Sequence, residues 1–213
     1  MKRLLGNNTS FKIDKKEAVE ITICILAISL AVLIAINVHT EKDLFSDPIT
    51  FSIFYLVFVF TIGLGFVLHE LSHKAVAIAY GAQARFMMWP QGLLLMFITS
   101  MIGFVFAAPG AVYIFARNIT KTQNGIISAA GPLMNMFLAI TFVLFSAISP
   151  EGYFPVNIWL FGAYINSLLA TFNLLPISPL DGSKVISWNF PIWVLLILTS
   201  IWMMMNFGGS LAL

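Results

Sequence analysis

The sequence predicts an all-α polytopic membrane protein with five to six transmembrane helices and a membrane-embedded β-hairpin or re-entrant segment. Hydrophobic residues make up 60% of the 213 residues, against about 45–50% in an ordinary soluble domain. Charged residues are 9%, where about 25% is usual, so the charges are too few to coat a soluble surface. The same balance excludes a disordered chain. A net charge of +2 without a basic stripe argues against a nucleic-acid binder.

Five apolar runs come close to the roughly 20 residues that a helix needs to cross a bilayer core about 30 Å thick. They are Ala18–Val38, Phe51–Tyr80, Ile126–Ser149, Val156–Leu175 and a shorter run, Phe190–Asn206. The first run does not look like a cleaved signal peptide, because it follows a long leader of mixed charge. No repeat or long linker divides the chain, so we expect residues 1–213 to form one domain.

A further apolar region, residues 92–115, is interrupted by Gly103, Pro109 and Gly110. β-Forming residues flank the Pro109-Gly110 dipeptide within residues 104–115, which favours a short helix followed by a hairpin. Irregular backbone survives at membrane depth only where it is buried in protein or lines a wet cavity. A simple broken helix is the alternative for this region.

Basic residues indicate how residues 92–115 cross the membrane. If this region enters and leaves on the same side, nearly all Lys and Arg residues face the cytosol and only Lys42 lies outside. A full crossing would move Arg117, Lys121 and Lys184 outside and weaken the positive-inside bias. We therefore expect a re-entrant region in a multi-pass protein of the cell membrane whose N-terminus is cytoplasmic.

The second run contains a His-Glu-x-x-His motif, His69-Glu70-Leu71-Ser72-His73. Residues four apart on a helix lie one turn apart on the same face, so both imidazoles can hold one zinc ion. Glu70 is adjacent to His69 in the motif and can reach water at the metal. A charged side chain at membrane depth costs about 2.5–3.5 kcal/mol, so this cluster indicates function. His39 has no comparable neighbours and is expected to be structural.

A catalytic zinc site needs a third protein ligand besides the two histidines. The single cysteine, Cys24, lies alone in an apolar run and is expected to be a core or lipid-facing residue. Asp181 follows Pro176 and Pro179, which end the preceding helix, and precedes Gly182, which permits a sharp turn. A solvated loop acid is the other interpretation of Asp181, and the missing third ligand favours the metal.

The His-Glu-x-x-His motif together with Asn173-x-x-Pro-x-x-Pro-Leu-Asp181-Gly resembles the site-2 protease family of intramembrane zinc metalloproteases. The chain is similar to a minimal prokaryotic form without peptide-binding or ligand-sensing domains. The resemblance implies a catalytic core at about 51–184, with three helices around one Zn²⁺ per chain. It implies that His69, His73 and Asp181 are the zinc ligands and that Glu70 is the catalytic acid/base. The implied substrate is itself a transmembrane helix.

The segment Ala130-Gly131-Pro132-Leu-Met-Asn135 is similar to the family's Gly-Pro-x-x-Asn stretch, which implies that Asn135 lies near the site. As a catalytic residue, Asn135 would fix the substrate backbone or steady the oxyanion. The alternative is an interhelical hydrogen bond, a common role of Asn in lipid. Gly131 and Pro132 are expected to serve packing, through close approach and a kink.

The sequence therefore predicts a zinc metalloendopeptidase of regulated intramembrane proteolysis, which cleaves within transmembrane segments. Its partners would be a transmembrane-helix protein substrate and the lipid bilayer, and no nucleic acid. An exposed strand edge in residues 104–115 could pair with the unwound substrate. Water would reach the site along a polar path past Asn173 or Asn135. The alternatives are a metal transporter or sensor, which usually offers metal-binding groups at several depths, and a catalytically inactive membrane adaptor.

Overall fold

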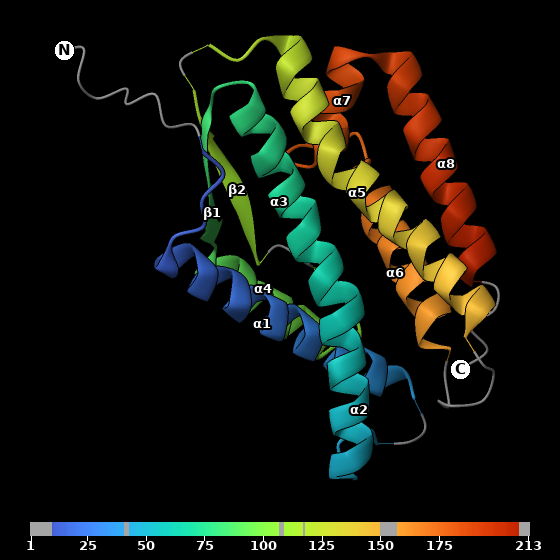
Figure 1. Cartoon of the computed structure of the whole chain (residues 1–213). Coiled ribbons are helices and arrows are strands. Elements are labelled where there is room, and N and C mark those ends of the chain that lie inside the picture. The colour runs from blue at the N-terminus through green and yellow to red at the C-terminus, as the bar shows by residue number, and fades with distance from the viewer. Residues whose placement is uncertain (1–9, 41–42, 107–108, 117, 150–156, 209–213) are drawn as a thin grey trace.

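The computed structural model describes residues 10–40, 43–106, 109–116, 118–149 and 157–208 (Figure 1). The elements are α1 (Lys15–His39), α2 (Pro48–Phe58), the π-helical turn η1 (Val59–Gly63), α3 (Leu64–Ala79), β1 (Gln83–Met88), α4 (Pro90–Ser100), β2 (Gly110–Phe115), α5 (Lys121–Ile148), α6 (Ile158–Asn173), α7 (Asp181–Trp188) and α8 (Phe190–Gly208). α2, η1 and α3 form one continuous column, with α5, α6 and α8 beside it, while α1 crosses it obliquely (Figure 1). Of the expected elements, residues 107–108 of the hairpin and 156 of the fourth run lie outside the described residues.

Four helices of the described chain are long and apolar enough to cross a membrane: α1, the α2–α3 column, α5 and α8. They confirm four of the five expected runs and the mostly helical class. The remaining run gives α6, which has only 16 residues against the roughly 20 that a span needs. It ends at Asn173, shortly before Pro176, so the expected span to Leu175 is too long.

The starts of three long helices follow from their capping residues. Asp14, Asp47 and Thr120 precede α1, α2 and α5, and each side chain accepts a backbone N–H of the first turn. Such caps satisfy donors that the helix itself leaves unpaired. Thr120 also forms a capping box with Gln123, which fixes the entry into the helix that covers the candidate site.

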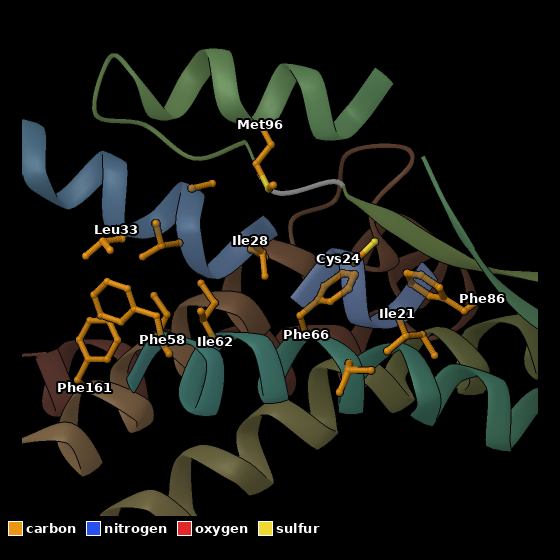
Figure 2. Packing of buried hydrophobic residues seen from close by; sticks show 14 of the residues in the cluster. Ile21, Cys24, Ile28, Leu33, Phe58, Ile62, Phe66, Phe86, Met96 and Phe161 are labelled. Carbon is orange, nitrogen blue, oxygen red and sulfur yellow. The ribbon is translucent and has the colours of Figure 1, made fainter. Parts of the chain in front are cut away.

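The largest apolar cluster packs α1 between α4 and the α2–α3 column (Figure 2). Figure 2 labels its central members, Ile21, Cys24, Ile28, Leu33, Phe58, Ile62, Phe66, Phe86, Met96 and Phe161. Cys24 is fully buried there, as expected of a core residue. The cluster reaches β1 through the ring of Phe86, which meets the ring of Phe66 edge to face at 6.0 Å between centroids. It therefore fixes the sheet against α3, the helix that carries the His-Glu-x-x-His motif.

The sheet differs from the hairpin expected in residues 104–115. β2 pairs in antiparallel register with β1, Gln83 opposite Phe115 and Met88 opposite Gly110. Pro109 and Gly110 therefore do not form the turn between two arms, and the expected hairpin is wrong in its partner strand. Local β propensity predicted β2. It could not predict the partner strand, because β1 precedes α4 in the sequence and β2 follows it. The register places the two ends of the segment 83–115 side by side.

A buried ion pair ties α1, α3 and β1 together. Lys74 of α3 donates to Glu17 of α1 at 2.5 Å and to the carbonyl of Lys12 at 2.7 Å. The same Glu17 oxygen accepts the backbone N–H of Phe86 at 2.9 Å. Lys74 and Glu17 are 1% and 2% exposed, so each depends on the other for compensation of its charge.

This ion pair gives a prediction for stability. Lys74→Met and Glu17→Gln should each destabilise the protein by about 3–5 kcal/mol, because each leaves one buried charge unpaired. The double variant should lose much less than the sum. Thermal unfolding in detergent measures all three proteins, and strictly additive losses would contradict the pairing.

Candidate metal centre

α3 presents His69, Glu70 and His73 to the interior of the molecule, and all three are buried. The helical spacing places the Nε2 atoms of His69 and His73 3.0 Å apart. The donor atoms of His69, Glu70 and His73 all lie within 4.8 Å of one another. The expected geometry of the motif is therefore present on one helix face.

Asp181, the first residue of α7, completes the group from a distant part of the chain. Its Oδ2 atom lies 3.3 Å from Nε2 of His69 and 3.0 Å from Nε2 of His73. The turn before it is tight, because a Cβ at Gly182 would lie 2.1 Å from the carbonyl oxygen of Leu174. Glycine at 182 is thus what allows α7 to start close to the end of α6 and to direct Asp181 at the histidines.

These three donors fit a zinc ion. Two imidazole nitrogens and a carboxylate oxygen are ligands that zinc prefers, and tetrahedral bonds of about 2.0–2.1 Å place neighbouring donors about 3.3 Å apart. The observed separations of 3.0–3.3 Å agree. Glu70 is near as well, but its Oε2 accepts the backbone N–H of Val112 at 2.8 Å. Oδ2 of Asp181, in contrast, lies at these distances from the Nε2 atoms of both histidines.

Gly131 of α5 leaves the space at which the donors converge. A Cβ there would lie 2.5 Å from Nε2 of His69 and 2.4 Å from Nε2 of His73. Its role is thus more specific than the packing expected from the sequence, because a side chain at 131 would occupy the space that a metal held by these donors would need.

The other nitrogen of each imidazole is held by an acceptor. Nδ1 of His69 lies 2.6 Å from Oδ1 of Asn135, and Nδ1 of His73 lies 2.7 Å from the carbonyl of Ile127. An acceptor at Nδ1 requires the proton to be there, which leaves the Nε2 lone pair free for a metal. Both partners come from α5, which passes directly over the motif.

Asn135 uses both ends of its amide inside the protein. Its oxygen faces His69, and its nitrogen donates to the carbonyl of Gly65 at 3.1 Å and to Oδ1 of Asn166 at 2.9 Å. The interhelical hydrogen bond considered from the sequence is therefore present. Contact of Asn135 with a substrate stays a prediction.

A cavity of about 240 Å³ opens beside these groups. Its wall includes the ligand candidates, Glu70, part of β2 and polar side chains from three helices: Asn124, Ser128, Asn135, Asn173 and Lys184. Nζ of Lys184 lies 3.6 Å from Oδ1 of Asp181. The polar residues expected along a water path, Asn173 and Asn135, both line this cavity. His39 lies elsewhere, within hydrogen-bond distance of the carbonyl of Gly103 at 3.0 Å.

Sequence reasoning missed several groups that act on this centre. The N–H of Val112 and the carbonyl of Ile127 belong to the backbone and leave no side-chain signature. Asn166 did have a signal, since it is a polar residue within an apolar run, where such residues are costly and mark function.

The chain is similar to proteins named as zinc metalloproteases. It is 39% identical over 186 residues to "Putative zinc metalloprotease MJ0611" of Methanocaldococcus jannaschii, covering 87% of this chain and 91% of that protein. It is 32% identical over 148 residues to "Putative zinc metalloprotease YwhC" of Bacillus subtilis, covering 60% of this chain and 66% of the relative. "Zinc metalloprotease MJ0392" of M. jannaschii is 30% identical over 138 residues, which span 34% of its length. No family model and no solved structure matches the sequence.

Proposed function

The chain belongs to the zinc metalloprotease family of these relatives, and from this premise we propose that it is an intramembrane protease of the site-2 type. It would hydrolyse peptide bonds within transmembrane segments of other membrane proteins. The observation that carries this proposal is the convergence of His69, His73 and Asp181 next to Glu70, on elements packed among helices long enough to span a membrane.

The described residues divide the chemistry between them. His69, His73 and Asp181 would hold one zinc ion, which supplies Lewis acidity and lowers the pKa of water. Glu70 would accept the proton of the attacking water and return it to the leaving nitrogen of the substrate. The N–H of Val112, bound to Oε2 of Glu70, fixes the carboxylate and leaves its other oxygen for this proton transfer.

The topology follows from the same elements. From Glu70 to the end of α3 at Ala79 is nine residues, or about 14 Å of helix, so water must enter along a polar path. The cavity wall with Asn173 and Lys184 supplies one. Because the ends of the segment 83–115 lie side by side, we propose that this segment enters and leaves on the cytosolic side, in a single domain with its N-terminus in the cytosol.

The outer edge of β2 is the proposed contact for an unwound substrate. A helical peptide bond is shielded by its own hydrogen bonds, so the substrate must become extended near the site. Residues of β2 line the cavity, and Val112 directs its N–H away from β1, toward Glu70. By the two-residue period of a strand, Ile114 directs its N–H and C=O to the same side. An extended segment there would gain backbone partners by strand addition.

Strand addition predicts a specific effect of proline at 114. Ile114→Pro removes an outward N–H, a position at which a strand tolerates proline, and should reduce cleavage at least about 10-fold. The zinc content should not change. Ile114→Val keeps the amide and should cleave normally, so equal cleavage by the two variants would remove this edge from the proposal.

The proposed function is tested with the purified chain in liposomes and a reporter that has one transmembrane segment. Cleavage should stop with a chelator and return with zinc. A transporter would instead move zinc across the liposome membrane without cutting the reporter, and an inactive adaptor would do neither. Absence of cleavage with zinc bound would contradict the protease.

A further inference from the structure

We propose that Asn166 of α6 is a positioning residue of the metal centre. It holds the amide of Asn135 in one orientation and thereby fixes which nitrogen of His69 faces the metal. The inference rests on the proposed zinc site, and its test reads metal binding without requiring proteolysis.

The orientation of the Asn166 amide is determined by backbone carbonyls. Its nitrogen donates to the carbonyl of Gly162 at 2.9 Å and lies 3.4 Å from the carbonyl of Thr61. A carbonyl only accepts hydrogen bonds, so the NH₂ group must face both of them. The oxygen of Asn166 must therefore face Asn135.

The same logic carries over to Asn135. Its nitrogen faces two acceptors, Oδ1 of Asn166 at 2.9 Å and the carbonyl of Gly65 at 3.1 Å. Its oxygen must then face Nδ1 of His69, which has to carry the proton. A reversed Asn135 amide would place a donor at Nδ1, move the proton to Nε2 and remove the lone pair that a metal needs.

The two asparagines lie in the tightly packed contact between α3, α5 and α6. Asn135 and Asn166 are both 0% exposed, and Asn166 is not part of the cavity wall, so its hydrogen bonds are made within the packed helices. Gly65 has no side chain where α3 meets α6, and a Cβ there would lie 2.4 Å from Oδ1 of Asn166. Thr61 lies in η1, the π-helical turn of the column, and such turns shift the hydrogen-bond ladder and often mark functional sites.

The first variant to test is Asn166→Leu in the full chain, in detergent. We expect zinc affinity to fall by about 10-fold, the lower end of the effect of losing a direct partner of a metal-binding histidine, because Asn166 acts through Asn135. The visible spectrum of bound Co²⁺ should change as well. The matched control is Ser167→Ala on the same helix, which removes a fully buried hydroxyl bonded only locally, to Ala163, and should leave zinc affinity and the spectrum unchanged.

Two further variants separate positioning from general damage. Asn166→Asp, as a neutral carboxyl, keeps one acceptor and one donor and should restore affinity to within a few-fold of the wild type. Gly65→Ala retains the asparagine at 166 but displaces its amide group, so it should weaken zinc binding. It tests the inference independently if Asn166→Leu does not fold.

A double-mutant cycle decides whether Asn166 acts through Asn135. If it does, Asn166→Leu should have little further effect on zinc affinity in an Asn135→Leu background. Wild-type zinc affinity and Co²⁺ spectra in both Asn166→Leu and Gly65→Ala would overturn the inference. A wild-type chain that binds no zinc would instead overturn the metal site itself, so the two failures are distinguishable.

Discussion

Glu70→Gln is expected to reduce cleavage of a transmembrane reporter by about 10²–10⁴-fold, the usual contribution of a general acid/base. The substituted amide has the same shape and can still accept the N–H of Val112, which Glu70 binds at 2.8 Å. It cannot accept a proton from water. Because Glu70 is not among the three proposed ligands, the variant should bind zinc like the wild type.

Glu20→Gln is the matched control for this change. Glu20 of α1 also accepts a backbone N–H of the sheet, that of Met88 at 3.3 Å, but it is not part of the cavity wall. Its amide variant should cleave within about twofold of the wild type, since the carboxylate that is changed lies outside the cavity and takes no part in the proposed chemistry. Zinc content and initial cleavage rates of the two variants, measured side by side, test the assignment. Full activity of Glu70→Gln would remove Glu70 from the mechanism.

Gly131→Ala is expected to abolish zinc binding. The added Cβ would lie within 2.5 Å of both Nε2 atoms. Gly131 is part of α5, which cannot move away without breaking the hydrogen bonds of Ile127 to His73 and of Asn135 to His69. The loss of affinity should exceed the 10–100-fold effect of outer partners of a metal site. Zinc content after dialysis against a competing chelator measures it.

Gly63→Ala controls for the strain of adding a methyl group between packed helices. Its Cβ would meet the branch methyl Cγ2 of Ile25 on α1 at 2.7 Å. Gly63 precedes His69 by six residues, or about 9 Å of helix. This variant should be less stable but should retain zinc. Equal zinc content in Gly131→Ala and the wild type would show that the metal lies elsewhere.

Local spacing made part of the centre predictable from sequence. His69, Glu70 and His73 lie within one helical turn, so their mutual geometry depends only on α3 being a helix. Asp181 could be identified by chemistry, because the chain offers few other donors near the ends of its apolar runs. Its distance from the histidines could not, because that depends on Gly182 allowing α7 to approach α6.

The sheet and the outer partners depend on tertiary contacts that local patterns do not encode. β2 has a clear β pattern, but its partner β1 lies on the other side of α4, and the Pro109-Gly110 dipeptide suggested a turn instead. α6 is shorter than its apolar run because Pro176 and the turn after it carry the chain back toward the centre. Asn135 was placed near the site by resemblance, whereas its hold on His69 depends on Asn166 and Gly65, which only the packed helices bring together.

The most direct measurement is an anomalous difference map at the zinc edge from crystals of the zinc-loaded chain. We predict one peak per chain, within bonding distance of Nε2 of His69, Nε2 of His73 and a carboxylate oxygen of Asp181. A peak bound by other residues, or one that Asp181 does not contact, would contradict a metal held by two imidazoles of α3 and the first carboxylate of α7.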